Sequence, residues 1–378
     1  MKVLRIGIII VISVLTGHAN AAWWQQQSVS TNWQAPALWG LISGDGTLGY
    51  PASGDRITIN RSNHSIYVTT NSVFGETNTA NSSSWSGINT QIEIWTNTSL
   101  TLIEDSELIW SGTGDAGLIG PGRFINEGVW NHNNSSAFVM GTNAVLENRG
   151  TFVEQVSTTN AIRFLSNSRF INQTNGTYEL AQSVSSVSYE TSEGGTFENF
   201  GTIDLNENPV TFLSTNGVGP TLVLHPSSRI VSTVIDSNEL GTLYYDQDLE
   251  LAGSVFLEFP YTPTNPSLTL IESSGTLSGY LTVENSNYMA RVGSNGEILL
   301  ENRPSNSVPA LAHTEVSGNT FSLTLSNLVT GGFYAIEHTT NLVTPAWTAL
   351  THLTATNDAM TWTSPLTDSN IFYRVIFH

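Results

Sequence analysis

Cysteine and lysine are the residue types that this sequence of 378 residues lacks most clearly. There is no cysteine, so no disulfide bond can stabilise the fold, and lysine occurs only at position 2. After the expected removal of residues 1–21, 10 arginines stand against 31 acidic residues, a net charge of −21. Nucleic acids and anionic membranes need densely basic surfaces, so this charge argues against both as partners.

Long apolar runs are also missing beyond the first residues. Residues 6–15 are apolar but too short to span a bilayer, and Lys2 and Arg5 give the start its charge. Ala19-Asn20-Ala21 supplies a small-x-small cleavage site. These features predict a secretory signal peptide, residues 1–21. The mature protein is expected to be secreted or held at a bacterial cell surface, without membrane insertion.

Sequence motifs of several catalytic classes are absent. No HExxH spacing and no Gly-x-Ser-x-Gly occur, so metalloprotease and esterase chemistry lack their residues. No EF-hand loop or glycine-rich nonapeptide for calcium is present. No cofactor is expected from the sequence.

The sequence does contain a phrase that returns four times between residues 123 and 205. The four copies begin with Phe124-Ile-Asn126, Leu146-Glu-Asn148, Phe170-Ile-Asn172 and Phe197-Glu-Asn199. Each continues to a glycine, and the asparagines stand 22, 24 and 27 residues apart. A period of about 20–30 residues indicates a solenoid, in which each coil buries its apolar face against its neighbours.

The content of the phrase favours one kind of solenoid. Strand residues surround a corner of the form Asn-x-Gly, for which the glycine is expected to supply positive φ. The dense leucine pattern of a leucine-rich repeat is missing. The prediction is an all-β protein with a right-handed parallel β-helix over residues 22–302, beginning with a tryptophan-rich cap. Prolines mark a linker at residues 303–309, and alternating strands predict a small antiparallel β-sandwich at residues 310–378.

Two stretches of the β-helix resemble the passengers of bacterial autotransporters. Asn32-Trp33 and Pro51-x-x-Gly54-Asp55 resemble their first coils. The run from Tyr245 to Leu257 and Leu299-Leu300 resemble their distal end. The resemblance implies an exported β-helix without implying an activity. The membrane barrel of a true autotransporter is not expected, because only 76 residues follow residue 302.

The last segment resembles a C-terminal module common in secreted bacterial proteins. The resemblance rests on Tyr334 to Leu342, on Trp347 and on Phe372-Tyr373-Arg374. Such modules accompany many unrelated neighbours, so the resemblance implies exposure or attachment and not chemistry.

Parallel β-helices also host polysaccharide lyases and hydrolases. A lyase needs a base and a cation that neutralises the uronate carboxylate. Arg149 and Arg163 are the candidates for these roles, with solvated surface charge as the alternative. Arg123 and Arg169 both precede a phrase and are expected to align two coils apart. The four arginines are expected to scatter over different faces, because their positions in the phrase differ.

Other candidate residues have a structural alternative as well. Carboxylates at Asp246, Asp248 and Glu250 are expected on one strand face, where they suit a metal ion, a glycosidase pair or simple hydration. Three tryptophans are candidates for stacking on sugar rings or for the core, namely Trp33, Trp39 and Trp130. The repeated Asn126, Asn148, Asn172 and Asn199 predict a structural ladder of amide hydrogen bonds.

The sequence thus favours an exported structural or adhesin-like β-helix protein without catalysis. A polysaccharide lyase or glycoside hydrolase on the same scaffold remains the enzymatic alternative, and a carbohydrate-binding protein is the third. The expected partners are extracellular polysaccharide or cell-surface components.

Overall fold

The computed structural model describes most of the chain after residue 22. The described residues are 23–26, 31–35, 39–43, 50–51, 55–59, 65–75, 82–86, 91–111, 117–133, 137–155, 162–181, 187–191, 194–214, 219–234, 239–259, 267–285, 287–303, 309–365 and 371–377. The expected signal peptide (1–21) and most of the expected linker (303–309) lie outside them. Among the described residues, no helix has the length and apolar character needed to cross a membrane.

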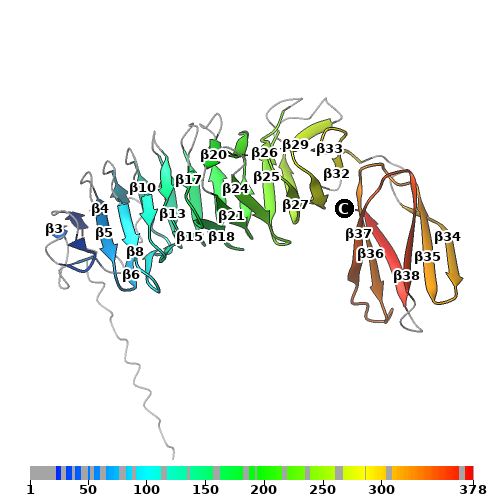
Figure 1. Cartoon of the computed structure of the whole chain (residues 1–378), viewed down its shortest axis with the longest axis horizontal. Coiled ribbons are helices and arrows are strands. Elements are labelled where there is room, and N and C mark those ends of the chain that lie inside the picture. Colours follow the sequence, from blue (N-terminus) through cyan, green and yellow to red (C-terminus); the bar gives the residue numbers. More distant parts are fainter. Residues whose placement is uncertain are drawn as a thin grey trace, which may run out of the picture.

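The described elements are all β-strands, and most of them stack as the coils of a parallel solenoid (Figure 1). The longest sheet contains, in spatial order, β3 (Trp39–Ser43), β1 (Trp23–Gln26), β4 (Arg56–Ile59), β7 (Ser83–Trp85), β10 (Glu107–Trp110), β13 (Val129–His132), β16 (Thr151–Glu154), β19 (Thr177–Leu180), β22 (Thr202–Asp204), β25 (Arg229–Thr233), β28 (Ser254–Glu258) and β31 (Thr282–Val283). We call it sheet A.

Two further faces complete each coil. Sheet B contains β17 (Ile162–Phe164), β14 (Phe138–Met140), β11 (Gly117–Ile119), β8 (Gln91–Ile94), β5 (Ser65–Val68) and β2 (Thr31–Asn32). Sheet C contains β24 (Pro220–Leu224), β21 (Gly195–Asn199), β18 (Arg169–Asn172), β15 (Val145–Asn148), β12 (Arg123–Asn126), β9 (Ser99–Leu102) and β6 (Ser72–Phe74). The expected all-β class with a parallel solenoid is confirmed.

The later coils use two more sheets before the fold changes. One contains β20 (Val187–Thr191), β23 (Val210–Ser214), β26 (Leu243–Tyr245), β29 (Ser267–Ser273), β33 (Glu297–Asn302) and β32 (Tyr288–Val292), and the other pairs β27 (Leu249–Leu251) with β30 (Leu277–Gly279). The pairings of β33 with β29 and with β32 are antiparallel, so the parallel stack ends there.

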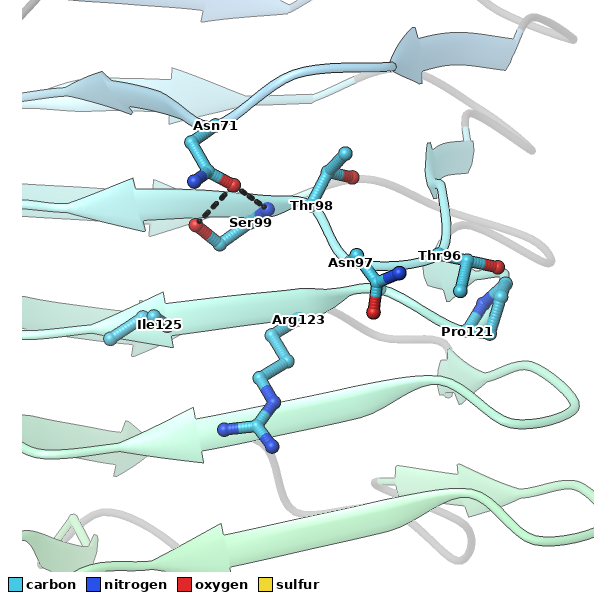
Figure 2. A pocket seen from close by; sticks show the side chains of 9 residues that line it. Asn71, Thr96, Asn97, Thr98, Ser99, Pro121, Arg123 and Ile125 are labelled. Atoms are coloured by element: carbon cyan, nitrogen blue, oxygen red, sulfur yellow. Dashed lines mark hydrogen bonds between the residues drawn. The ribbon is translucent and has the colours of Figure 1, made fainter.

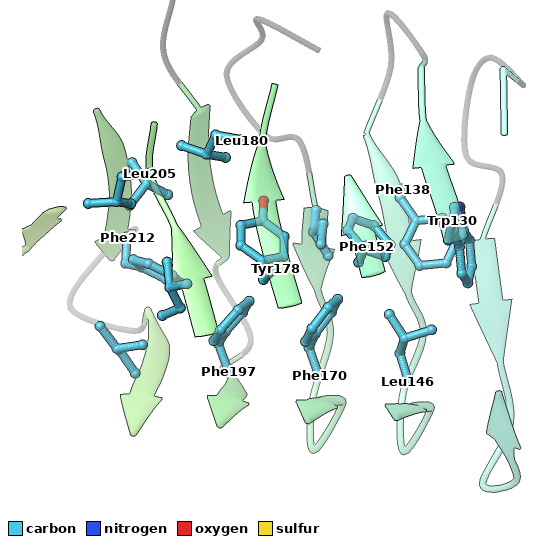
Figure 3. Packing of buried hydrophobic residues seen from close by; sticks show 14 of the residues in the cluster. Trp130, Phe138, Leu146, Phe152, Phe170, Tyr178, Leu180, Phe197, Leu205 and Phe212 are labelled. Carbon is cyan, nitrogen blue, oxygen red and sulfur yellow. The ribbon is translucent and has the colours of Figure 1, made fainter. Parts of the chain in front are cut away.

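The core lies inside the coils and is built by the alternation of each strand. In β10, for example, Leu108 and Trp110 are buried while their neighbours are partly exposed. The repeated phrases stack in register, so that Phe124, Leu146, Phe170 and Phe197 form one row. Figure 3 shows Leu146, Phe170 and Phe197 of this row, with Phe152 and Tyr178 from the second strands of two phrases opposite them in the interior. The rings of Phe170 and Phe197 are stacked with centroids 4.8 Å apart.

The glycine of each phrase allows successive coils to approach one another closely. Gly150 and Gly201 have no positive φ, so the expectation of left-handed backbone at these corners is wrong. A Cβ atom at Gly150 would collide with the carbonyl oxygen of Gly128, and one at Gly201 with that of Gly176. The residue is glycine because a neighbouring backbone occupies the space of a side chain.

The tryptophan-rich start covers the first coil. Strand β1 pairs antiparallel with β3 and parallel with β4, which covers the N-terminal edge of sheet A. Trp33 packs against Trp39 with ring centroids 5.0 Å apart and against Phe74 at 5.7 Å. The indole N–H of Trp39 donates a 2.6 Å hydrogen bond to the carbonyl oxygen of Trp33.

Two small antiparallel sheets follow the solenoid (Figure 1). One contains β34 (Ala310–Ser317), β35 (Thr320–Ser326) and β38 (Ala359–Pro365), and the other contains β37 (Thr348–Thr354), β36 (Phe333–Thr339) and β39 (Phe372–Phe377). We call this region the sandwich. Its own core cluster contains the buried residues Leu323, Leu325, Leu328, Tyr334, Ile336 and Ala355.

The sandwich packs directly against the end of the solenoid. Phe333 is buried in the solenoid core, and the amide of Val292 donates a 3.0 Å hydrogen bond to the carbonyl oxygen of Gly331. The rings of Tyr280 and His352 are stacked with centroids 3.7 Å apart. The sandwich therefore supplies part of the cover for the last coil.

Candidate functional site

The repeated asparagines form a buried chain of hydrogen bonds through four coils. The Nδ2 of Asn126 donates to Oδ1 of Asn148 at 2.7 Å. Asn148 donates in the same way to Asn172 at 2.8 Å, and Asn172 to Asn199 at 2.7 Å. Each of the first three amides also donates to a backbone carbonyl of the following coil. All four side chains are inaccessible to solvent, so the ladder holds the coils in register and touches no ligand.

Arg149 is held by acidic partners on the outside of sheet C. Its guanidinium donates to Glu147 at 2.8 and 3.0 Å and to Glu127 at 3.1 Å. The hydrogen bond to Glu147 is the main reason that the pKa of Arg149 is raised. Arg163 lies on the outer face of β17 in sheet B, which separates it from Arg149. The structure therefore does not bring these two candidates into one catalytic cluster.

The three candidate carboxylates do not share a strand face. Only Glu250 lies on β27, while Asp246 and Asp248 belong to the turn before it. Asp246 accepts hydrogen bonds of 2.6 Å from both the amide and the hydroxyl of Ser214. Asp248 accepts a 2.7 Å bond from the amide of Thr276. Among the described residues there is no group of three histidine, cysteine or acidic side chains that could hold a metal ion.

The three candidate tryptophans are core residues. Trp33 and Trp130 are fully buried and Trp39 is 5% exposed, so none of them presents a ring face to a sugar. The exposed tryptophan among the described residues is Trp95, at 49%. The sequence already contains the signal that places it outside. Ile92 and Ile94 are the buried positions of β8, so Trp95 continues the outward series of that strand.

A buried ionisable pair lies inside the solenoid. Nδ1 of His132 is 2.8 Å from Oε2 of Glu154, and both side chains are fully buried. The imidazole ring is stacked on Trp110 with centroids 4.5 Å apart. Because no substrate reaches this position, the pair belongs to the core and not to a surface site.

A groove of about 460 Å³ lies at the corner between sheets B and C (Figure 2). It crosses three successive coils, at the turns before β6, β9 and β12. Its lining combines amide, hydroxyl and guanidinium groups with two apolar side chains; the residues are Asn71, Thr96, Asn97, Thr98, Ser99, Pro121, Gly122, Arg123 and Ile125. The lining is more polar than that of most small-ligand sites, which suits a hydrophilic ligand.

The groove lies beside a corner whose sequence differs from that of its neighbours. The corners before β9, β15 and β18 have four residues each, with an asparagine at φ near 60° at Asn97, Asn143 and Asn167. The corner before β12 consists of Gly120, Pro121 and Gly122 alone. Pro121 stands where the corners before β15 and β18 have their asparagine, so no asparagine side chain covers the surface beside Asn97.

A pair of carboxyl groups with raised pKa values lies on the outer face of sheet A. Glu179 and Asp204 are register partners on neighbouring strands. Burial, followed by the charge of Asp204, raises the pKa of Glu179. Burial also raises the pKa of Asp204, against a hydrogen bond from the amide of Asn206. The period of the phrase predicts that these residues align, but only the structure shows how far they are desolvated.

Arg229 lies on the next coil of the same face. It binds Glu284 through two hydrogen bonds of 2.8 and 3.0 Å, and its guanidinium lies 4.6 Å from the ring centroid of Phe256. These contacts occupy the guanidinium of Arg229, which is therefore not free to bind a ligand.

Comparison with known proteins identified no relative of this chain. No protein family model, no curated protein and no solved structure matches the chain. Its function is therefore inferred from its own residues and geometry.

Proposed function

We propose that the protein is an exported structural protein, adhesin-like and without catalysis, that acts outside the cell or at its surface. The observation that carries this proposal is the uninterrupted core of the solenoid. Aromatic rows and the asparagine ladder continue from coil to coil, which makes a rod that needs no disulfide bond. A rod of this kind holds an exposed surface and the sandwich at a distance from its point of attachment.

Two further features support the same function. The apolar segment at residues 6–15 and the small-x-small site ending at Ala21 are typical of a secreted protein. The resemblance to autotransporter passengers and to the C-terminal module of secreted bacterial proteins points to the same location. Arg149, the residue suited to neutralising a uronate, is engaged by Glu127 and Glu147, which argues against lyase chemistry.

Location and catalysis are tested separately. The full chain, expressed in a bacterial host, should appear in the medium or at the cell surface and should begin at Ala22 by mass spectrometry. A variant lacking residues 2–21 should remain in the cytoplasm. Retention of the full chain in the cytoplasm would contradict export.

The purified protein should release neither unsaturated uronides nor reducing ends from alginate, pectin or sulfated glycans. Release that is abolished by Arg149→Ala or Arg163→Ala at an unchanged melting temperature would replace the structural function by that of a lyase.

Glycoside hydrolysis is the second candidate function, and one observation favours it. Register partners on parallel strands stand about 4.8 Å apart, and retaining glycosidases use two carboxyl groups separated by about 5–5.5 Å. Glu179 and Asp204 are such register partners, and both have raised pKa values. If the protein releases reducing ends from a glycan and both Glu179→Gln and Asp204→Asn abolish the release, this function holds. Glu250→Gln, also on an outer strand face, is the matched control.

A further inference from the structure

We propose that the groove between sheets B and C binds an anionic sugar unit of an extracellular polysaccharide, either a hexuronate or a sulfated hexose. We call it the corner groove, with the nine lining residues given above. Because the ligand is extracellular, this inference rests on the proposed export but not on the absence of catalysis, and binding by the purified chain is measured independently of export.

The first support is the charge of the lining. Arg123 is the charged residue among the nine, and no carboxylate lines the groove. In a mature chain with a net charge of −21, a surface with one cation and no acid is unusual. It favours an anionic ligand locally, where charge-assisted hydrogen bonds to arginine are strongest.

The second support is that Arg123 retains donors for a ligand. Its Nη1 is 3.3 Å from Oε2 of Glu147, and its side chain is 60% exposed. Glu147 is at the same time bound by Arg149 and by Gln173. A guanidinium carries five N–H donors, so most of those on Arg123 remain available for a carboxylate or sulfate.

Arg169 lies in the same row as Arg123 and serves as the comparison, because it is not proposed to bind a ligand. It occupies the register position of Arg123, two coils further along sheet C. Its Nε and Nη2 donate to the two carboxylate oxygens of Glu198 at 2.7 and 2.9 Å. The closed two-point pair at Arg169 contrasts with the single long contact at Arg123.

The third support is the set of amides along the groove. Oδ1 of Asn71 accepts from the amide of Ser99 at 3.0 Å, as Figure 2 shows, which orients the side chain and leaves its Nδ2 as the donor. Further along the solenoid, Asn167 donates to Asn143 at 3.4 Å across neighbouring corners. Asn97 cannot extend this row, because the next corner contains Pro121 in place of an asparagine. Its amide therefore borders the hollow with both a donor and an acceptor.

The fourth support is apolar surface for the sugar ring. Pro121 and Ile125 line the groove beside the polar groups. Trp95, which is 49% exposed, directly precedes Thr96 at the rim. Proteins that bind sugars combine well-placed hydrogen bonds with an apolar or aromatic surface that contacts the C–H faces of the sugar ring. The corner groove brings both together with a cation.

The test is calorimetric titration of the full chain with oligosaccharides of matched length. Oligogalacturonate supplies carboxylates, a sulfated galactan oligosaccharide supplies sulfates, and a cello-oligosaccharide is the neutral control. We expect binding of one or both anionic ligands and none of the neutral one. The stronger of the two anionic ligands identifies the source of the charge.

Three variants locate the binding. Arg123→Gln should weaken it about tenfold or more, because a charge-assisted hydrogen bond is lost. Ile125→Ala should weaken it severalfold, because Ile125 is an apolar residue of the lining, while Arg169→Gln should remain within about twofold of the wild type. Melting temperatures should stay close to that of the wild type in all three, because Glu147 keeps Arg149 when Arg123 is replaced.

Three results would overturn the proposal. The first is the absence of binding for both anionic ligands, and the second is equal binding of the neutral ligand. The third is an equal loss in Arg123→Gln and Arg169→Gln, which would assign the affinity to general surface charge.

Discussion

The solenoid and the sandwich are both built from β-strands, but they bury their side chains to different degrees. Solenoid strands alternate between buried and partly exposed residues, as in β10 and β13. Strand β38 of the sandwich alternates between partly and fully exposed residues, and Val343 is 90% exposed. Each inner coil of the solenoid is covered by a neighbouring coil on both sides. The two three-stranded sheets of the sandwich bury side chains only on the face that they share.

This difference in burial indicates which region contributes more to the stability of the folded protein. In the solenoid each coil adds a nearly equal increment through its neighbours, so the core grows with length. The sandwich has a core of a few residues, and its Phe333 is buried in the core of the solenoid. The solenoid is therefore expected to be the stable part and the sandwich the dependent one.

Trp130→Ala should have the largest effect. Trp130 is fully buried at the centre of the solenoid, with its ring 5.2 Å from that of Phe138 and 5.4 Å from that of Phe152. Loss of such a side chain costs about 3–5 kcal/mol. Chemical denaturation should show the loss, and Trp95→Ala on the surface should cost under about 0.5 kcal/mol. Equal losses in the two variants would contradict the burial of Trp130.

Phe333→Ala tests the dependence of the sandwich. Phe333 starts β36 but is buried in the solenoid core, so its removal leaves a cavity between the two regions. We expect a loss of about 3 kcal/mol and an earlier melting of the sandwich in differential scanning calorimetry. Phe372→Ala, at a position that is 40% exposed, is the control. If the sandwich melts at the same temperature in the Phe333 variant, it is stable without the solenoid.

Asn148→Ala interrupts the asparagine ladder, which belongs to the solenoid. Asn126 loses its acceptor and Asn172 its donor, and both amides are buried. Unsatisfied buried groups of this kind cost about 1–3 kcal/mol. The melting temperature should fall accordingly, while Asn133→Ala on the exposed side should leave it unchanged. An unchanged melting temperature for Asn148→Ala would show that the ladder does not contribute to the stability of the protein.

Glu179→Gln should have the smallest effect, and its sign depends on pH. Burial and the charge of Asp204 raise the pKa of Glu179 in the folded state above that in the unfolded state. The proton bound by the folded state stabilises it below the unfolded pKa, and this stabilisation is lost as pH rises through the folded pKa. The variant should therefore be more stable than the wild type at pH 7, by under about 1 kcal/mol after solvent screening.

The comparison of melting temperatures at acidic and neutral pH checks this sign. At a pH below the unfolded pKa, about 4.3, the advantage of the variant should vanish. A variant that is less stable than the wild type at pH 7 would contradict the raised pKa.

Much of the solenoid could be predicted, because its signal is local and repeated. The period of the phrase placed Asn126, Asn148, Asn172 and Asn199 in one row, which is the register of sheet C. The same period aligned Trp130 with Phe152 on sheet A. A side chain that recurs at each coil must meet its own copy in the next, so sequence spacing translates directly into contact.

The candidate site was harder to predict, because it depends on an exception to the repeat. The corner groove lies where Pro121 takes the place of the asparagine of other corners. Sequence reasoning concentrated on buried tryptophans and missed Trp95, although its alternation with Ile92 and Ile94 placed it outside. The ion pair of Arg149 with Glu127 joins the same position of two successive phrases, so the repeat contained this signal as well.

By itself, the sequence determined the all-β class, the period of the coils and the rows of asparagines and aromatic rings. It did so because a solenoid repeats the same short-range contacts, which a period in the sequence encodes. Only the tertiary structure decided which arginine is held by carboxylates, why the glycines are needed, and how Phe333 joins the sandwich to the solenoid. These outcomes depend on the exact distances between backbones and charges on different coils, and no single stretch of sequence specifies such distances.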